Sequence, residues 1–384
     1  MKIMKGFINS KTYVKGRGII RTNIGFNEGR IAVIGGPPED IQSLSDTGDC
    51  LLVAGFIDEH IHGAGGADAM DGTAEALSVI SKTLVKEGTT SFLATTMTQS
   101  DDNVKNALKS VAQFSGCGGA NLLGVHLEGP FISHSYIGAQ PPQYVREPSA
   151  EYFKQLQAAS GNKITMVTLA PEEDGDFGLI SYLKSQGIIS SVGHSAATAE
   201  CVDRAVSRGL SCVTHTFNAQ SPLHHREIGV VGSALLNDRL CCEVIADTVH
   251  VSVPALKLLI KNKPKDKIVL ITDSIRAKGM PDGLSELGGQ KVFVKDGQAR
   301  LADGTLAGSV LKMNQAVKTL VAECGMSIED AVDCATYNPA KNLGIEKDYG
   351  VIKEGAAADF TLLNGNFEVM MTVVGGEIVY TKSD

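Results

Sequence analysis

Two histidines at the end of an apolar run are the first residues in the chain that could do chemistry. The stretch "GFIDEHIHG" (residues 55–63) places His60 and His62 two residues apart. In an extended strand, residues i and i+2 point to the same face, so the two imidazoles would project together, as paired metal ligands must. Imidazole is a common ligand for zinc and similar ions. A solvated loop could carry the same pair without binding a metal.

Further candidate ligands follow later apolar runs in the same manner. They are Glu128, His194, His215, Asp247 together with His250, and Asp273. Neutral imidazoles bind borderline metals, a glutamate can bridge two ions, and a carboxylate outside full ligation can move protons, so this set suits a hydrolytic metal centre. Taken singly, His194 and His215 could instead be buried histidines bonded to the backbone, and Asp273 could be a helix N-cap.

These residues would have to be positioned by a recurring unit of an apolar, β-branched run, a polar or glycine stop, and a helical stretch. The runs span residues 51–62, 90–96, 121–129, 163–172, 187–195, 211–219, 241–247 and 267–274. Eight strands alternating with helices predict an α/β fold, a (β/α)8 barrel, whose catalytic residues gather at the C-terminal ends of the strands. A doubly wound open sheet is the alternative, but the first run lacks its G-x-G-x-x-G turn.

The two ends of the chain differ from the repeating unit. Residues 1–52 contain short strands and turns, and the C-terminal segment has "NGN" and "GG" turns typical of hairpins. We therefore predict a small β-sandwich domain built from residues 1–52 and 355–384, with the catalytic barrel spanning residues 53–354.

Composition narrows the class of protein. A net charge of −8 argues against a nucleic-acid binder, and no apolar run approaches the ~20 residues needed to cross a bilayer. The N-terminal stretch lacks the apolar segment and cleavage site of a signal peptide. The eight cysteines show no C-x-x-C spacing and fit reduced thiols. We expect a cytoplasmic protein without nucleic-acid or membrane partners.

The strand-end motifs also resemble a known family. They read "AGFIDEHIHG", "GVHLEGPFIS", "SVGHSAAT", "THTFNAQSPLHHREIGVVG", "IADTVHV", "LITDSIRAKG" and "LADGTLAGSVLKMNQAV". Together, over nearly the whole chain, they resemble the N-acetylglucosamine-6-phosphate deacetylases, which are metal-dependent barrels of the amidohydrolase superfamily.

The resemblance implies a divalent metal centre with one or two ions per subunit. Glu128, His194 and His215 would hold one ion, and His60 and His62, sharing Glu128, would hold a second. Zinc, iron, manganese and cobalt all suit such ligands. The resemblance also implies that Asp273 is the general base and acid, which takes a proton from the attacking water and delivers one to the leaving amine.

The resemblance further implies where a phosphorylated amino-sugar substrate would bind. His250 would contact the sugar or the acyl oxygen, and the phosphate would contact Arg226 reaching in from the neighbouring subunit of a homodimer. The remaining substrate-binding residues would be Ala139, Gln140, Asn218, Ala219, Leu306, Ala307 and Gly308. Without that context, the "HHRE" segment around Arg226 could be a polar surface loop.

Three residues depart from the pattern of the family. Gln140 stands where some members have histidine; it can donate a hydrogen bond but cannot carry charge. Gln220 replaces a methionine, and Thr248 replaces a glycine and would add bulk near the sugar.

The implied reaction is hydrolysis of the N-acetyl group of N-acetylglucosamine 6-phosphate to glucosamine 6-phosphate and acetate, in amino-sugar catabolism or cell-wall recycling. One alternative is a deacetylase for a related substrate such as N-acetylgalactosamine 6-phosphate. The other is a non-enzymatic barrel used as a scaffold, which predicts lost ligands, whereas this chain retains them.

Overall fold

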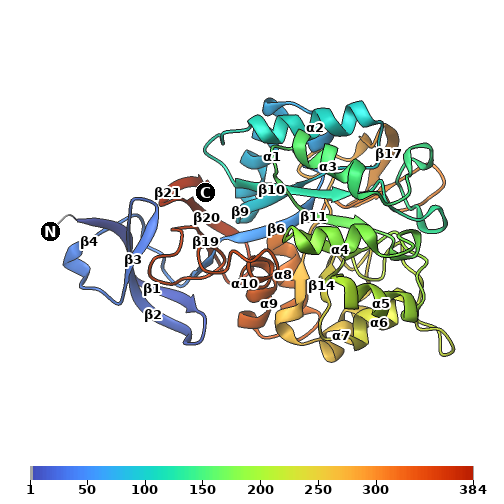
Figure 1. Cartoon of the computed structure of the whole chain (residues 1–384). Helices are drawn as coiled ribbons and strands as arrows, with labels where there is room; N and C mark the ends of the chain where they lie inside the picture. The colour runs from blue at the N-terminus through green and yellow to red at the C-terminus, as the bar shows by residue number, and fades with distance from the viewer. Residues whose placement is uncertain (1–2, 384) are drawn as a thin grey trace.

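The computed structural model describes residues 3–383, in which a barrel lies beside a smaller β unit that contains both chain ends (Figure 1). The barrel sheet is parallel, with strand order β15-β14-β13-β12-β11-β10-β9-β6. Its strands are β6 (Phe56–Ile61), β9 (Thr89–Thr95), β10 (Asn121–Glu128), β11 (Ile164–Leu169), β12 (Ile189–Val192), β13 (Cys212–Val213), β14 (Cys241–Val244) and β15 (Ile268–Leu270). Each of the eight predicted runs coincides with one of them, with β9 beginning one residue before its run, and the predicted (β/α)8 barrel is confirmed.

The two edge strands of this sheet meet through contacts just beyond β15. The N–H of Asp273 donates to the carbonyl oxygen of His60 at 2.9 Å. The Asp58 carboxylate accepts from the N–H of Thr272 at 3.2 Å. These bonds bring the last strand end beside the first and complete the ring on which the candidate site lies.

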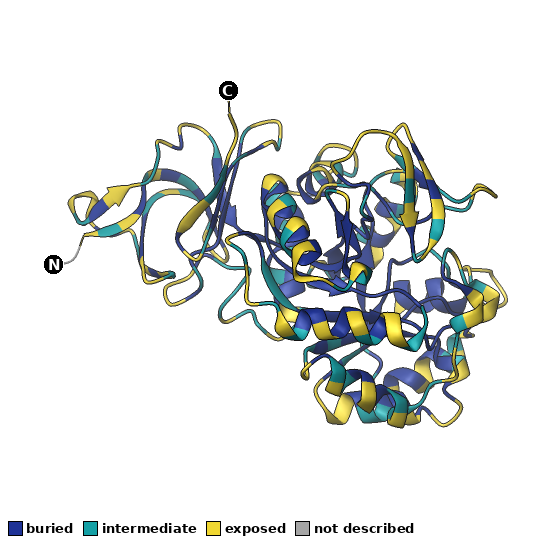
Figure 2. Cartoon of the chain, turned by 90° about the horizontal axis from the view of Figure 1, so that it is seen from above, coloured by how far each residue is buried: buried dark blue, intermediate teal, exposed yellow. Residues whose placement is uncertain are grey.

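Helices cover the outside of the barrel (Figure 2). They are α1 (Ala74–Leu84), α2 (Asp101–Gln113), α3 (Ala150–Ala159), α4 (Gly178–Ser185), α5 (Ala199–Arg208), α6 (Gly229–Leu236), α7 (Val253–Asn262), α8 (Met313–Ala322), α9 (Ile328–Ala335) and α10 (Tyr337–Asn342). Threonine side chains cap the first turns of α1 and α5, where Thr73 and Thr198 accept backbone N–H bonds. Most of these helices bury one side and expose the other, whereas α6 is buried along its whole length up to Leu235.

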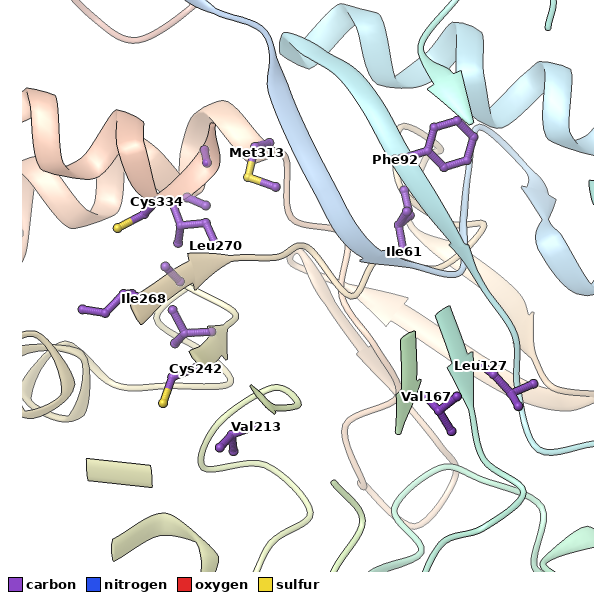
Figure 3. Close-up of a cluster of buried hydrophobic side chains, with 14 of the residues drawn as sticks. Ile61, Phe92, Leu127, Val167, Val213, Cys242, Ile268, Leu270, Met313 and Cys334 are labelled. Carbon is purple, nitrogen blue, oxygen red and sulfur yellow. The ribbon is translucent and has the colours of Figure 1, made fainter. Parts of the chain in front are cut away.

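Along β10, apolar side chains that pack against the helices alternate with polar side chains that point into the barrel. Leu127 in β10 belongs to the large apolar cluster between strands and helices, with Val213, Cys242 and Met313 (Figure 3). Because successive strand residues point to opposite faces, the neighbours of Leu127, His126 and Glu128, point into the barrel. The same register that buries the apolar residues against the helices therefore brings the polar ones inward.

The smaller unit is one mixed sheet in the order β21-β20-β19-β5-β1-β2-β3, with β4 paired to β1. Its strands are β1 (Met4–Val14), β2 (Gly18–Asn27), β3 (Arg30–Ile34), β4 (Ile41–Ser43), β5 (Leu51–Ala54), β19 (Phe360–Leu363), β20 (Val369–Val374) and β21 (Glu377–Thr381). Its core includes Phe7, Phe26 and Phe360 in mutual ring contact. The prediction of a small β-domain from both termini is confirmed.

Gly55 separates this sheet from the barrel. Residues 51–54 form β5 of the small sheet and residues 56–61 form β6 of the barrel, so the first predicted run contains two strands. A Cβ on Gly55 would lie 2.0 Å from Thr90 Oγ1, so only glycine fits where the chain passes between the units. The division at residues 52 and 355 remains a prediction.

Short elements complete the fold. A hairpin of β7 (Gly63–Ala64) and β8 (Ala67–Asp68) follows β6, and a three-stranded antiparallel sheet follows β15: β16 (Gly283–Leu287), β17 (Gln290–Lys295) and β18 (Gln298–Arg300). The 3-10 helices are η1 (Pro38–Asp40), η2 (Ala69–Asp71), η3 (Val85–Glu87), η4 (His134–Tyr136), η5 (Pro142–Tyr144), η6 (Pro171–Glu173) and η7 (Lys265–Lys267). Within residues 3–383, every helix is too short or too polar to cross a membrane.

Candidate metal centre

Six side chains from five barrel strand ends meet at one end of the barrel. We call His60, His62, Glu128, His194, His215 and Asp273 the ligand cluster. Oε1 of Glu128 lies 3.1 Å from Nε2 of His215 and 3.3 Å from Nε2 of His194. Its Oε2 lies 3.3 Å from Nε2 of His62. Glu128 is therefore at the centre of the cluster.

Backbone strain marks three of these positions. His194, His215 and Asp273 have φ values of 50°, 30° and 47°. Each follows its strand by two or three residues, where the chain leaves the barrel wall. Non-glycine residues in this region carry a conformational cost and are concentrated at functional sites. The strained turns direct the three side chains back over the barrel mouth.

Three histidines of the cluster are oriented with Nδ1 held by the backbone and Nε2 turned toward Glu128. Nδ1 faces a backbone carbonyl in three of them: Thr95 O at 3.3 Å for His62, Tyr136 O at 2.9 Å for His194, and Asn218 O at 3.2 Å for His215. A carbonyl only accepts, so each Nδ1 carries a proton, and Nε2 is the ring atom left to face an ion. This is the arrangement that a metal-binding imidazole requires.

The geometry fits two neighbouring ions. Ligand atoms of Glu128, His194 and His215 lie within 4.8 Å of one another, as do those of His60, His62 and Asp273. The Nε2 atom of His60 is buried and has no hydrogen-bond partner within residues 3–383. An unpartnered buried nitrogen aimed at two carboxylates is expected where a cation belongs. The predicted assignment of one ion to each half of the cluster remains a proposal.

Electrostatics inside the cluster favour charged carboxylates. Burial alone would raise the pKa of Glu128, but the facing imidazoles of His60, His194, His215 and His62 hold it well below its usual value. Burial likewise opposes ionisation of Asp273, yet His60 and His62 lower its pKa to about 2. Both carboxylates are therefore ionised at neutral pH, as metal ligation and proton acceptance require.

A cavity of about 510 Å³ opens onto the cluster. His62, Glu128, His194, His215 and Asp273 form its floor. Of the predicted substrate-binding residues, its wall contains Ala139, Gln140, Asn218, Ala219, His250, Leu306 and Gly308. The volume is that of a site for a single small molecule.

Two of the wall residues are held by specific bonds. Nδ1 of His250 lies 2.6 Å from the Asp247 carboxylate, which fixes the ring at the cavity wall. Gln140 donates from Nε2 to Oε2 of Glu128 at 2.8 Å, while its Oε1 accepts from the N–H of Thr98. Gln140 thus braces the central carboxylate, a contact that the sequence did not predict.

The substrate-binding residues implied by the resemblance differ in whether their backbone N–H groups are available to a ligand. Asn218 N–H already donates to His215 O at 3.0 Å, and Ala307 N–H donates to Ala299 O at 3.0 Å. Ala307 is also fully buried and does not line the cavity. Among residues 3–383, the N–H groups of Ala219 and Gly308 have no intramolecular acceptor and remain available to a ligand.

Arg226 lies outside the cavity. It is exposed in the loop before α6, and its guanidinium contacts Nε2 of His225 at 2.7 Å. No lysine or arginine from the described part of the chain lines the cavity. A phosphate bound there would therefore have no lysine or arginine partner from its own subunit. In the homodimer that the resemblance implies, Arg226 of the neighbouring subunit would be that partner.

The structure also accounts for the other two departures from the family pattern, Gln220 and Thr248. Gln220 is buried and braces its own turn, donating to Thr214 O at 2.6 Å and accepting from Phe217 N–H. Thr248 keeps a φ of 65°, a conformation that favours glycine, and its side chain is exposed. Thr248 does not line the cavity, so the expected crowding of the sugar is not found.

Two buried residues near the cluster were missed by the sequence analysis. His126 packs edge-on against the His60 ring, with centroids 4.5 Å apart. Glu243 in β14 lies 3.1 Å from Nδ1 of His60. His126 could have been found, because it precedes Glu128 by two residues in one strand and so shares its face.

Comparison with known proteins places the chain in a family. The model of the amidohydrolase family matches residues 51–379. The N-acetylglucosamine-6-phosphate deacetylase of Bacillus subtilis (strain 168) is 43% identical over 369 residues, which cover 94% of this chain and 93% of the relative. The N-acetylgalactosamine-6-phosphate deacetylase of Escherichia coli O157:H7 is 38% identical over 330 residues, covering 85% and 87%.

A solved structure agrees in fold over the same extent. The crystal structure of N-acetylglucosamine-6-phosphate deacetylase from Pasteurella multocida superposes with a TM-score of 0.92 at 32% identity, covering 99% of this chain and 100% of that one. The matched region includes the barrel, the strand-end motifs and the C-terminal strands. The chain belongs to the amidohydrolase family.

Proposed function

We propose that this protein is a metal-dependent deacetylase that hydrolyses N-acetylglucosamine 6-phosphate to glucosamine 6-phosphate and acetate. The observation that carries the proposal is the convergence of four imidazoles and two ionised carboxylates at the barrel mouth, where all of these side chains except His60 line a small-molecule cavity. The 43% identity to the Bacillus subtilis enzyme over 94% of the chain supports the choice of substrate.

The cluster would hold the metal and supply the proton transfer. Glu128, His194 and His215 would hold one divalent ion of zinc, iron, manganese or cobalt, and His60 and His62 a second. When bound, such an ion lowers the pKa of its water to about 7 and polarises a carbonyl oxygen. Asp273, ionised and lining the cavity floor, accepts the proton of the attacking water. It then returns a proton to the amine nitrogen as the C–N bond breaks.

The wall of the cavity would orient the substrate. His250, anchored by Asp247, is placed to hydrogen-bond the acyl oxygen or a sugar hydroxyl. The N–H groups of Ala219 and Gly308 are free to bond phosphate oxygens. Oriented donors of this kind reduce the entropy lost on reaching the transition state.

We further propose a homodimer in which Arg226 reaches the neighbouring site. The cavity lacks a cation of its own among the described residues, while Arg226 is exposed on a loop next to the cavity segment around Ala219. A guanidinium matches phosphate geometry with two parallel bonds. Eight free cysteines fit a reducing compartment, and we propose a cytoplasmic location.

The choice of sugar is tested by acetate release from the metal-loaded protein. We expect turnover of N-acetylglucosamine 6-phosphate with a kcat/KM well above that for its galactosamine epimer and for unphosphorylated N-acetylglucosamine. A preference for the epimer would assign the protein to the other deacetylase. No acetate from any N-acetylhexosamine phosphate would contradict the proposed function.

Arg226→Ala is expected to lower kcat/KM for the phosphorylated substrate roughly 10- to 100-fold, the loss expected for a charged hydrogen bond. Activity on the unphosphorylated sugar should change little, which is the internal control. An equal effect on both substrates would contradict the phosphate assignment.

Co-expression distinguishes contact within a subunit from contact between subunits. Arg226→Ala and Asp273→Asn chains are each expected to be impaired alone. In a symmetric dimer, half of the randomly paired molecules are mixed and hold one intact site, so we expect recovery to about a quarter of the wild-type rate. No recovery in isolated mixed dimers would contradict a contact between subunits and place Arg226 in its own subunit's site.

A further inference from the structure

We infer that Glu243 is a positioning residue: through a single carboxylate oxygen it holds His60 and His215 in fixed positions relative to each other. Its Oε2 lies 3.1 Å from Nδ1 of His60 and accepts the backbone N–H of His215 at 3.3 Å. His60 belongs to one half of the cluster and His215 to the other. The inference rests on the proposed metal centre.

His60 is the exception among the four histidines of the cluster. His62, His194 and His215 direct Nδ1 to backbone carbonyls, whereas His60 alone directs it to a side-chain carboxylate. An imidazole bonded to a carboxylate is oriented and made a stronger electron donor at its other nitrogen. Glu243 therefore fixes the direction in which His60 presents Nε2.

The position of Glu243 is itself fixed. It is fully buried in β14 between Cys242 and Val244, both of which pack in the apolar cluster behind the strand. Strand alternation therefore turns Glu243 into the barrel. Its backbone carbonyl accepts the N–H of Thr216 at 2.8 Å, which ties β14 to the turn that carries His215.

The His60 ring is also restrained on its face. His126 packs against it in a T-shaped contact with a centroid separation of 4.5 Å. His126 is in turn held by Thr168 Oγ1 at 2.7 Å and by the backbone carbonyl of Glu59 at 3.2 Å. With its face packed and Nδ1 bonded, the ring has one orientation, which points Nε2 at Glu128 and Asp273.

The test is the affinity of each half of the cluster for a metal, measured with zinc alone by competition against a chromophoric chelator. In Glu243→Gln we expect the zinc held by His60 and His62 to lose affinity roughly 10- to 100-fold, the typical effect of removing such an outer partner. The zinc held by Glu128, His194 and His215 should change less. Two equivalents bound with wild-type affinities would overturn the inference.

Glu59→Gln is the matched control. Glu59 is equally buried and lies next to Glu243, but the hydrogen bond of its side chain is to Asn342 rather than to a cluster histidine. We expect wild-type zinc affinities in this variant. An equal loss in both variants would show that general charge in the barrel, and not the His60 contact, sets the affinity.

A measurement on the unmutated holoprotein covers the case in which Glu243→Gln does not fold. With 15N-labelled histidine, the His60 ring should show a proton on Nδ1 and metal-bound Nε2. A His60 ring bound to zinc through Nδ1 would overturn the inference. If the wild-type protein binds no zinc at all, the proposed metal centre fails, which is a different result from wild-type affinities in the variant.

Discussion

Asp273→Asn is expected to lower kcat roughly 10²- to 10⁴-fold, the range that a positioned proton-transfer group contributes. The asparagine keeps the shape of the side chain but can neither accept the proton of the attacking water nor return one to the amine. Because facing imidazoles lower the pKa of Asp273 to about 2, its carboxylate is ionised throughout the neutral range. Steady-state kinetics of acetate release provide the measurement.

The metal content of Asp273→Asn shows whether a loss of activity reflects lost proton transfer or a lost metal ion. Oδ1 of Asp273 lies 3.2 Å from Nε2 of His62, so the substitution could also weaken an ion held there. We expect the purified variant to keep the ion held by the other half of the cluster and to bind substrate with a KM near that of the wild type. A kcat within a factor of a few of the wild type would remove Asp273 from the proton-transfer role.

Glu128→Gln is expected to have a still larger effect, because Glu128 contacts both halves of the cluster. Its loss removes the central negative charge among four imidazoles. We expect less than one ion per chain by elemental analysis. A bound ion contributes several kcal/mol, so the rate should fall by roughly 10³-fold or more.

Glu173→Gln is the matched control for Glu128→Gln. Glu173 is an exposed glutamate in η6, just beyond β11 and outside the cluster. The Glu173→Gln variant should retain the metal content and the rate of the wild type. Wild-type metal content in Glu128→Gln would contradict the central place of this carboxylate.

Local patterns in the sequence predicted the barrel and placed the six members of the cluster among eight candidates at strand ends, and the resemblance to the family then singled out the six. The i, i+2 rule placed His60 and His62 on one face, and the alternation of apolar runs with helices placed the later residues at neighbouring strand ends. That all six meet could be expected from parallel strands in one ring. The phosphate contacts came from the resemblance, and they stay proposals.

Contacts between segments distant in sequence could not be predicted. The Nδ1 partners of the histidines depend on how β9, β14 and the segment around Tyr136 pack around the barrel mouth. The motif assigned Ala307 to the substrate. In the structure its N–H donates to the carbonyl oxygen of Ala299 in β18, and its methyl group packs in the apolar cluster beside that strand. A motif fixes which residues are nearby but not which of them face the cavity.

The sheet β16–β18 was missed although its turns were readable. Gly288 and Gly289 join β16 to β17 with φ values of 57° and 82°, and Asp296 and Gly297 join β17 to β18 with 51° and 73°. Two successive positive φ values define type I′ hairpin turns, for which "GG" and "DG" are strong signals. Leu287 of this sheet lines the cavity.

Anomalous X-ray scattering from crystals of the metal-loaded protein tests the account most directly. Data collected above and below the absorption edge of the bound metal should give one strong peak among Glu128, His194 and His215. A second peak is expected beside His60 and His62, with Glu128 between the two. Loaded protein that shows no peak within ligand distance of these side chains would contradict the claim that the barrel mouth is a metal centre.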